Sequence, residues 1–330
     1  MFTIDINNIR IIPLDFCVFF LDASNYIGRF KFSKKQYINE AVFKDLMQEI
    51  LENNDKKIIG VDMSNISSYP MHIFSKISSN ENVFFFNINE ENIRLRMKED
   101  LPQLIWRSDE TAIFSMDKWS EINEMLKNDC KNSRKIKQAE IMRKTMLRQE
   151  DVYTLESSGL YSNCYLSIKK LFREVEDFYF IIFSLAHRIS DLPKFDAFVT
   201  SSKNGAIIAT ILGDILNVKE IHLIGIGPKY SMEFDGSVDS IKPGKRYVYI
   251  FDFMCTGTEL KIVSALINSK KGILKAAIGI SRYKKNINVS LSGSIEVLLE
   301  QKELGIEYLI AGSKEGLQIL KDGKDGKDDE

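Results

Sequence analysis

A short polar turn joins an apolar run to a helical pattern in residues 247–263, which read YVYIFDFMCTGTELKIV. A strand that ends near Phe251 would place the Thr-Gly-Thr sequence of residues 256–258 at the start of a helix. The unpaired N–H groups of a helix N-terminus attract anions, and a glycine lets the backbone approach an oxyanion closely. The segment therefore predicts a phosphate loop, with an ordinary strand-to-helix turn capped by a threonine as the alternative.

Asp252 and Cys255 are two residues of this turn with chemistry of their own. The carboxylate of Asp252, just before the turn, is suited to bind sugar hydroxyls or a magnesium ion. A phosphorylated sugar would therefore suit the turn as a whole. Cys255 stands near the helix N-terminus, where the pKa of a thiol can fall and its reactivity rise, and a small spacer is the alternative.

Three further segments of the second half carry related patterns. The stretch 195–210, FDAFVTSSKNGAIIAT, is a strand that ends in a small-residue turn and closes on Gly205. The stretch 154–167, TLESSGLYSNCYLS, has a distinctive spacing of Leu155, Gly159, Ser162 and Tyr165. The connection 227–246 contains Lys229 but no histidine, and its middle is acidic through Glu233, Asp235 and Asp239.

Together these four segments resemble the type I phosphoribosyltransferase superfamily, and within it most closely the orotate phosphoribosyltransferases, over roughly the C-terminal half. The turn resembles the family's 5-phosphate loop, and Lys261 matches the arginine that follows it. Phe251 replaces the first of the family's two aspartates, and Asn204 replaces the basic residue of its pyrophosphate loop. Glu156 replaces the lysine of the hood that covers the base, and Lys229 lies in the counterpart of the flexible basic loop.

The resemblance implies a role for each matching residue. The residues that would hold phosphoribosyl pyrophosphate (PRPP) are Thr256, Gly257 and Thr258 at its 5-phosphate, and Ser202, Lys203 and Gly205 at its pyrophosphate. Asp252 would bind the ribose hydroxyls and the Mg²⁺ that accompanies PRPP, and Asp252 and Lys229 would be the catalytic residues. Tyr165 would stack over the base and Lys261 would contact a base substituent. The resemblance also implies a homodimer.

The departures from the family pattern bear on activity. An active enzyme of this kind would transfer phosphoribosyl from Mg-PRPP to a nitrogenous base. The missing first aspartate, the acidic connection and Glu156 each remove charge that pyrophosphate chemistry uses. The sequence therefore favours a protein that binds PRPP or a nucleotide, with weak or non-classical catalysis and a sensing role. An active orotate-phosphoribosyltransferase-like enzyme is the alternative, and a purely structural protein would not need the Thr-Gly-Thr turn in register with Asp252.

Composition limits the remaining possibilities. A length of 330 residues suggests about two domains, and 44% hydrophobic residues supply enough apolar surface for two cores. A formal net charge of −1 argues against a whole-molecule attraction to nucleic acid or membranes. The sequence shows neither an apolar run of spanning length nor a signal-peptide pattern, so a cytoplasmic protein is expected. The scattered four cysteines and three histidines argue against a structural zinc site.

Residues 1–125 form a separate α/β domain in this interpretation. Strands are expected over 9–22, 56–64 and 82–88, and helices over 34–54 and near 71–78. The phrase IIGVDMSNIS loosely resembles the small STAS domains, which implies a regulatory or protein-binding role. In it, Asp62 and Ser64 are either polar residues of a recognition turn or plain turn formers.

Residues 126–150 carry more bases than acids and are expected to form a helical linker. The basic residues are Lys127, Lys131, Arg134, Lys135, Lys137, Arg143, Lys144 and Arg148. A nucleic-acid-binding arm is the alternative, but the aromatics or groove-reading fold of such an arm are missing. A phosphoribosyltransferase-like domain is expected over 151–318, followed by a disordered charged tail over 319–330.

Strand and helix patterns alternate through the second half, which predicts a mostly parallel sheet with helices on its faces. The loops 200–206 and 252–259 both follow strands of that sheet. Ligands bind such sheets at the carboxyl ends of the strands. We therefore expect the two loops to converge on one ligand.

Overall fold

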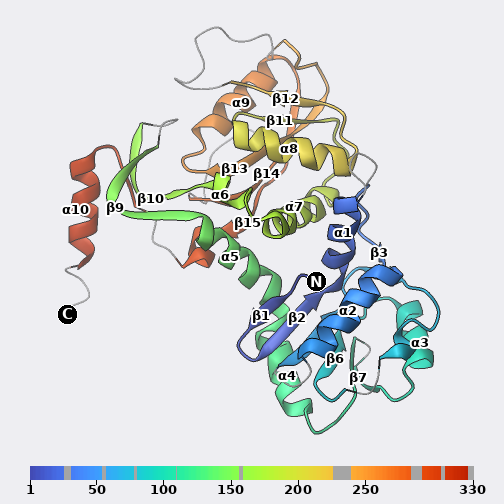
Figure 1. Cartoon of the computed structure of the whole chain (residues 1–330). Helices are drawn as coiled ribbons and strands as arrows, with labels where there is room; N and C mark the ends of the chain where they lie inside the picture. The colour runs from blue at the N-terminus through green and yellow to red at the C-terminus, as the bar shows by residue number, and fades with distance from the viewer. Residues whose placement is uncertain are drawn as a thin grey trace. The chain divides into compact units, whose positions relative to one another are not determined.

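The computed structural model of the chain divides into two compact units, Met1–Lys137 and Gln138–Glu330 (Figure 1). The division lies inside the segment expected to be a linker. The structure describes residues 1–25, 31–53, 57–77, 80–108, 110–155, 159–225, 239–283, 292–305 and 309–325.

The first unit is built on a six-stranded mixed sheet in the order β1-β2-β4-β6-β8-β7. Strands β2, β4 and β6 run parallel, and the outer pairs are antiparallel. The strands are β1 (Ile4–Ile6), β2 (Ile9–Pro13), β4 (Ile58–Asp62), β6 (Val83–Phe86), β7 (Ile105–Ser108) and β8 (Thr111–Ile113), with β3 (Gln36–Tyr37) and β5 (Ile66–Ser68) in a small separate sheet. The helices of this unit are α1 (Leu14–Asn25), α2 (Glu40–Asn53), α3 (Glu91–Asp100) and α4 (Trp119–Asn128). Every residue of β4 and β6 is buried, as in a strand covered on both faces.

The strand expected over 9–22 is wrong in its second part. β2 ends at Pro13, and the helix α1 begins at Leu14. Asp15 lies in the first turn of α1, where a carboxylate is favoured by the helix dipole. The following apolar run is the buried side of this helix, and the periodicity of so short a run does not separate a buried helix from a buried strand. The helix expected near 71–78 is a single 3-10 turn, Phe74–Lys76.

Asp15 and Asp62 lie at the carboxyl ends of β2 and β4, and one arginine binds both of them. Nη2 of Arg134 lies 2.6 Å from Oδ1 of Asp15 and 2.9 Å from Oδ2 of Asp62. Asn65 donates to Asp15 at 2.8 Å, and Asn87 donates to Asp62 at 2.9 Å. Both carboxylates are almost fully buried, whereas the Arg134 side chain is 29% exposed. A basic residue of the expected linker therefore belongs to a buried ion cluster.

The turn after β4 supports the plainer of the two interpretations of Asp62 and Ser64. The N–H and the hydroxyl of Ser64 donate to Oδ1 of Asp62 at 3.0 and 2.6 Å. Such bonds from the next residues are typical of an Asx turn. Because Asp62 is only 2% exposed, its carboxylate shapes the turn and binds Arg134 instead of facing a partner.

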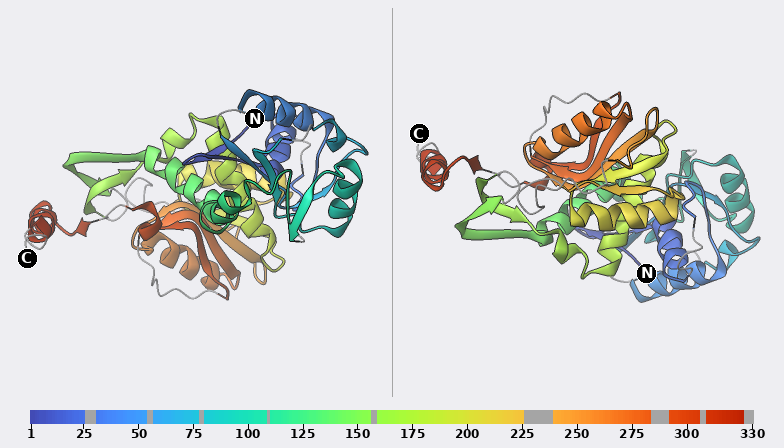
Figure 2. Two further views of the ribbon diagram at one scale, coloured as in Figure 1. Left: turned by 90° about the horizontal axis from the view of Figure 1, so that it is seen from below. Right: turned by 90° about the horizontal axis from the view of Figure 1, so that it is seen from above.

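The second unit contains the parallel sheet that the sequence predicts, with strand order β12-β11-β13-β14-β15. Its strands are β11 (Ala197–Thr200), β12 (Ile221–Leu223), β13 (Arg246–Met254), β14 (Ile273–Arg282) and β15 (Ile295–Glu300). The helices beside it are α7 (Val175–Ser190), α8 (Lys203–Leu216) and α9 (Thr258–Ser269). α8 and α9 cover opposite faces of the sheet (Figure 2).

The direction of strand addition reverses between β11 and β13. From β11 the chain passes through α8 to β12 on one side, and β13, β14 and β15 follow on the other side. The carboxyl ends of the two strands beside such a switch point bound the crevice in which α/β sheets bind ligands. Both predicted loops therefore flank the crevice that this topology creates.

The other elements of the second unit form a small antiparallel sheet and its surroundings. They are α5 (Ser133–Thr145), which crosses the division between units, β9 (Met146–Leu155), β10 (Leu160–Leu166), α6 (Ile168–Leu171), β16 (Ile310–Ala311) and α10 (Lys314–Asp325), with 3-10 turns at Cys130–Asn132 and Gln301–Leu304. The disordered tail expected from residue 319 is helical as far as Asp325, because α10 includes that stretch and buries Leu317. No helix in the described part of the chain is long and apolar enough to cross a membrane.

Candidate functional site

The loop after β11 turns directly into α8 and caps that helix with its own side chain. Ser202 has an extended backbone, and its hydroxyl accepts a hydrogen bond from the N–H of Gly205 at 2.9 Å. The carbonyl of Ser202 also accepts from the N–H of Ala206 at 2.9 Å. A serine in this position satisfies donors that a helix N-terminus otherwise leaves unpaired. The N-terminus of α8 is therefore partly occupied by the protein itself.

The loop after β13 leaves the start of α9 open. Gly257 takes the N-cap position with φ +76°, and no side chain of the described residues caps the helix. This left-handed backbone favours glycine over any other residue. Thr256 and Thr258 flank it, with their hydroxyl oxygens 2.9 Å apart. The three predicted phosphate residues thus place two hydroxyls beside uncapped N–H groups, which is an arrangement suited to a phosphate.

Two hydrogen bonds join the loops, so the structure brings the predicted halves of the site together. Nδ2 of Asn204 donates to Oδ2 of Asp252 at 3.0 Å. The hydroxyl of Ser201 donates to Oε2 of Glu259 at 2.5 Å. Ser201 and Asn204 lie in the predicted loop 200–206, and Asp252 and Glu259 lie in the predicted loop 252–259. In the structure Asn204 is in the first turn of α8, Asp252 near the end of β13 and Glu259 in the first turn of α9. The convergence expected from the sequence is therefore present in the structure.

Ser201 also lies 2.6 Å from the hydroxyl of Tyr249, which is a residue of β13. Since the single proton of Ser201 goes to Glu259, the hydroxyl of Tyr249 must donate to Ser201. Burial, followed by the charge of Glu259, raises the pKa of Tyr249. The result is a chain of hydrogen bonds that ends on a carboxylate between the loops.

Thr200 and Gly205 make the first loop tight. The Thr200 side chain is fully buried, and its hydroxyl has no hydrogen-bond partner among the described residues. A Cβ added at Gly205 would lie 2.2 Å from that hydroxyl and 3.1 Å from the carbonyl oxygen of Ile250. Only glycine fits at this position, because the buried hydroxyl of Thr200 occupies the space that a Cβ would need.

Tyr165 is a residue of the predicted hood whose pKa is affected by the charge of Asp252. It lies on β10 with 40% of its surface exposed, and its ring stacks on Tyr153 with centroids 6.1 Å apart. Burial, and then the charge of Asp252, raise the pKa of Tyr165. The role of Tyr165 against a base stays a prediction.

No protein-family model matches the sequence, and no curated protein matches it significantly. Solved structures match about half of it. An orotate phosphoribosyltransferase from Aeropyrum pernix is 18% identical, covers 50% of this chain and 94% of its own, and gives a TM-score of 0.39. An adenine phosphoribosyltransferase from Trypanosoma brucei, in complex with AMP, pyrophosphate and ribose-5-phosphate, is 16% identical over 54% and 82%, with a TM-score of 0.38. The orotate phosphoribosyltransferase of Mycobacterium tuberculosis is 13% identical, covers 52% of this chain and 99% of its own, and gives a TM-score of 0.36.

The chain is similar to phosphoribosyltransferases in fold. The similarity covers about half of the chain. The roles of single residues stay predictions.

Phe251, at the position of the first aspartate in the phosphoribosyltransferase motif, is part of the core. Its side chain is 3% exposed and stacks on Tyr249 with ring centroids 5.9 Å apart. Since successive residues of a strand face opposite sides, Asp252 points away from this core. The phenylalanine therefore neither enters nor closes the ligand crevice.

The structure does not bring every predicted site residue to the loops. Lys203 and Lys261 are exposed on the first turns of α8 and α9, and within the described residues neither makes an ion pair. Lys229 and Glu156 lie outside the described residues. Lys203 and Lys261 are thus free to meet a ligand but are not held in place for one.

Magnesium is the cofactor that the sequence resemblance implies. Among the described residues, no three side chains of His, Cys, Asp or Glu converge on one point. A magnesium ion that binds with a phosphorylated ligand needs only one or two carboxylates, because water and phosphate oxygens complete its shell. Asp252 fits this demand, since its Oδ2 accepts from Asn204 and its Oδ1 remains available.

Cys255 fits the interpretation as a small spacer, because burial raises its pKa to about 11 from an ordinary value of 9.0. At pH 8 only about one thiol in a thousand would be ionised, against about one in ten at the ordinary value. We expect iodoacetamide to alkylate Cys255 about a hundredfold more slowly than an unstructured cysteine peptide. Mass spectrometry of the peptide containing Cys255 measures this rate, and a rate equal to that of the free peptide would contradict the assignment.

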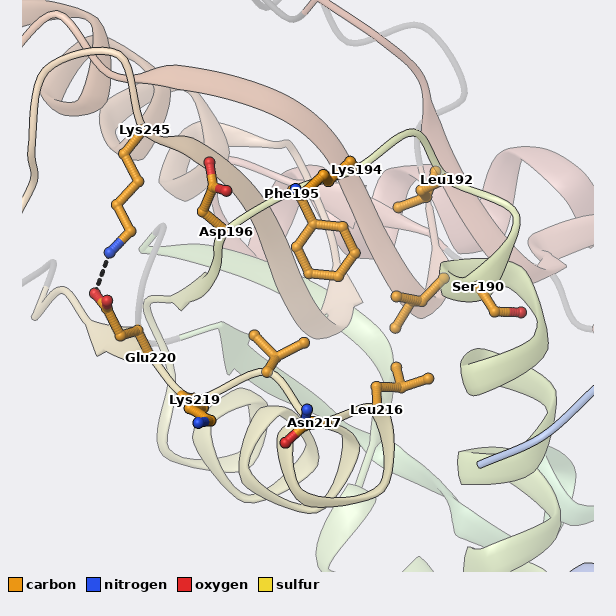
Figure 3. A pocket seen from close by; sticks show the side chains of 12 residues that line it. Ser190, Leu192, Lys194, Phe195, Asp196, Leu216, Asn217, Lys219, Glu220 and Lys245 are labelled. Carbon is orange, nitrogen blue, oxygen red and sulfur yellow. Dashed lines mark hydrogen bonds and ion pairs between the residues drawn. The ribbon is translucent and has the colours of Figure 1, made fainter. Parts of the chain in front are cut away.

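A groove of about 760 Å³ lies at the opposite, amino-terminal edge of the sheet (Figure 3). It is lined by Ile189, Ser190, Leu192, Lys194, Phe195, Asp196, Leu216, Asn217, Val218, Lys219, Glu220 and Lys245, and it contains none of the predicted site residues. Its acids are already paired, Glu220 with Lys245 and Asp196 with Arg246, the latter at 2.7 Å. The predicted site residues are therefore at the other edge of the sheet.

The sequence did not single out Ser201, Tyr249 or Glu259 as site residues. Ser201 directly precedes the predicted pyrophosphate residues, and Glu259 directly follows the predicted phosphate residues. The signal available for them was their place at the carboxyl ends of β11 and β13, where side chains of different loops meet. Their pairing spans 58 residues of sequence, which no local pattern reveals.

Proposed function

We propose that the second unit binds a phosphoribosyl ligand, either PRPP or a nucleotide, at the Thr256-Gly257-Thr258 turn. The observation that carries this proposal is the open N-terminus of α9 beside two threonine hydroxyls, at the switch point of a parallel sheet. Backbone N–H groups donate hydrogen bonds, and hydroxyls can also donate them. Together they suit a phosphate dianion, which accepts hydrogen bonds.

In this proposal the other predicted residues surround the sugar and the base. Asp252 accepts hydrogen bonds from the ribose hydroxyls and would hold the Mg²⁺ that enters with PRPP. Tyr165 faces the base through its ring, and Lys261 meets a base substituent. The residues proposed for the pyrophosphate end of PRPP are Ser202, Lys203 and Gly205.

We propose a sensing role with weak or non-classical catalysis, in preference to efficient transfer. Phe251 is buried in the core, so Asp252 is the single acid that this strand offers to ribose and metal. Charge stabilisation of a transition state requires charged groups held in place beforehand. Lys203 is exposed and unpaired among the described residues, and therefore gives little of that preorganisation. Lys229 would be the other cation of such a reaction.

A homodimer, a cytoplasmic setting and a protein partner of the first unit complete the proposal. The STAS-like interpretation of the first unit is part of the same hypothesis. Sedimentation of the full chain with and without the phosphorylated ligand measures the dimer.

The test of the proposal is calorimetric titration of the full chain with ribose 5-phosphate and with PRPP, both in the presence of magnesium. We expect saturable binding in the wild type and at least about a tenfold loss of affinity in the Thr256→Ala, Thr258→Ala double variant. A hydrogen bond to a charged group contributes about 1.5–3 kcal/mol, so the loss of two hydroxyls suffices for this change. Binding that survives unchanged in the double variant would place the ligand elsewhere.

Thr210→Ala is the matched control for this titration. Thr210 is an exposed threonine of α8 that lies outside both loops, and its hydroxyl donates to the carbonyl of Ala206 at 2.8 Å. It should bind both ligands like the wild type. If neither ligand binds the wild type, the proposed function is wrong and the fold serves another purpose.

A further inference from the structure

The two helix N-termini at the switch point are not equivalent. Ser202 caps α8 by accepting from the N–H of Gly205, whereas no described side chain caps α9. An anion at α8 would have to compete with this cap for a donor, but an anion at α9 would not. The site therefore offers one open place for a phosphate instead of two.

A carboxylate adds to this difference. Glu259 is the second residue of α9, and its Oε2 accepts from Ser201 at 2.5 Å. The side chain thus extends from α9 to Ser201 of the first loop and brings its negative charge to that residue. A phosphate group bound at the first loop would lie near that charge, and like charges repel.

The first loop has little positive charge to offset Glu259. Its single basic side chain, Lys203, is exposed and forms no ion pair in the part of the chain that the structure describes. The amide of Asn204, next in sequence, already donates to Asp252 at 3.0 Å. At this loop the N-terminus of α8 is capped, the amide of Asn204 is already hydrogen-bonded, and the carboxylate of Glu259 is near. Each of these features disfavours a pyrophosphate.

We propose that Glu259 makes this site selective for ligands with a single phosphate monoester, of the nucleoside 5′-monophosphate class, and against ligands that also carry a pyrophosphate. This inference rests on the proposed function and specifies its ligand. Glu259 acts as a specificity-determining residue: the monoester binds at the open N-terminus of α9, and the carboxylate excludes a second anionic group from the first loop.

Ribose 5-phosphate and PRPP form the matched pair of probes, because they differ only by the pyrophosphate on the sugar. We expect the wild type to bind PRPP no more tightly than ribose 5-phosphate, at constant magnesium. Glu259→Gln keeps a hydrogen-bond acceptor for Ser201 and removes the charge, so it should raise the affinity for PRPP relative to ribose 5-phosphate at least tenfold. Calorimetry gives both dissociation constants and hence their ratio.

Glu176→Gln is the control for the change of charge. Glu176 is the second residue of α7, as Glu259 is of α9, and it is exposed. This variant should leave the ratio of the two affinities at its wild-type value. Asn204→Lys is a second test that leaves Glu259 in place: it adds a positive charge at the first loop and should move the ratio in the same direction.

The outcomes separate the inference from the proposed function. A wild type that binds PRPP more than tenfold tighter than ribose 5-phosphate would overturn the inference and leave the phosphate site standing. A ratio that neither Glu259→Gln nor Asn204→Lys changes would also overturn it. Failure of both ligands to bind the wild type would instead overturn the proposed function.

Discussion

Replacing Arg134 with methionine is expected to lower the free energy of unfolding of the first unit by about 3–5 kcal/mol. Arg134 lies 2.6 Å from Asp15 and 2.9 Å from Asp62, and both carboxylates are almost fully buried. Methionine fills much of the space of the arginine but leaves two buried negative charges without a cation. Removing one partner of a buried ion cluster costs far more than removing the entire cluster, because the remaining charges cannot return to water.

The two tryptophans of the chain make this measurement specific for the first unit, since both Trp106 and Trp119 belong to it. Their fluorescence during denaturant unfolding should show a lower midpoint for Arg134→Met. The triple variant with Asp15→Asn and Asp62→Asn removes the stranded charges and should recover most of the loss. A single variant that loses less than about 1 kcal/mol would mean that water reaches the carboxylates through the exposed part of the Arg134 site.

The pH dependence of the same experiment has a definite sign. Burial alone would raise the pKa of Asp62, but Arg134 and the hydrogen bonds from Ser64 and Asn87 outweigh it and lower the pKa below 3.8. A carboxyl with a lowered pKa contributes stability above its unfolded pKa and loses it as the pH falls through its folded pKa. The wild type should therefore lose this contribution below about pH 4. In Arg134→Met the arginine no longer counteracts the effect of burial, so the pKa of Asp62 should be higher than in the wild type. The difference in the free energy of unfolding between variant and wild type should therefore become smaller as the pH falls.

Arg134 also shows what the sequence could not reveal. The composition of 126–150 predicts a basic helical linker, and the structure has α5 there, but the strand β9 begins at Met146. The partners of Arg134 are 72 and 119 residues away along the chain. Local charge counts describe how many cations a segment has, but the destination of each side chain depends on tertiary contacts.

The prediction of the fold succeeded where the signal was local. The parallel sheet of the second unit follows from apolar runs bounded by turn residues, and the two loops follow from the ends of those runs. The same approach failed at 9–22, because a continuous apolar run fits a buried strand as well as it fits α1. The cross-loop bonds of Ser201 and Asn204 lay beyond it as well, since each joins residues of different loops.

The second large effect is expected from Gly279→Ala in β14, which should destabilise the second unit by about 3 kcal/mol. Gly279 is the register partner of Phe251 on β13. A Cβ at Gly279 would lie 2.2, 2.3 and 2.6 Å from three carbons of the Phe251 ring. The ring has nowhere to move without disturbing its neighbours, because it packs in the core against Tyr249. Overpacking of this kind forces side chains off their rotamers and shifts the backbone.

Hydrogen exchange of the β13 and β14 amides measures this effect within the second unit. Gly312→Ala is the matched control, because no atom lies within 4 Å of the Cβ that it would add. Adding Phe251→Leu to Gly279→Ala should restore protection by making room for the methyl group. If the double variant is no more protected than Gly279→Ala alone, the clash with the ring is not the cause.

The same pair connects the core to the proposed ligand site. Asp252 directly follows Phe251 on β13, so a displaced ring moves the carboxylate that accepts from Asn204. Gly279→Ala should therefore lower both the stability of the second unit and its affinity for ribose 5-phosphate. Adding Phe251→Leu to this variant should restore both. Phe251 is thus a core residue that holds β13 in place for Asp252. Phe251 thus contributes to binding by positioning Asp252. This contribution is measured as a loss of affinity for ribose 5-phosphate in Gly279→Ala that Phe251→Leu reverses without any change in the loops.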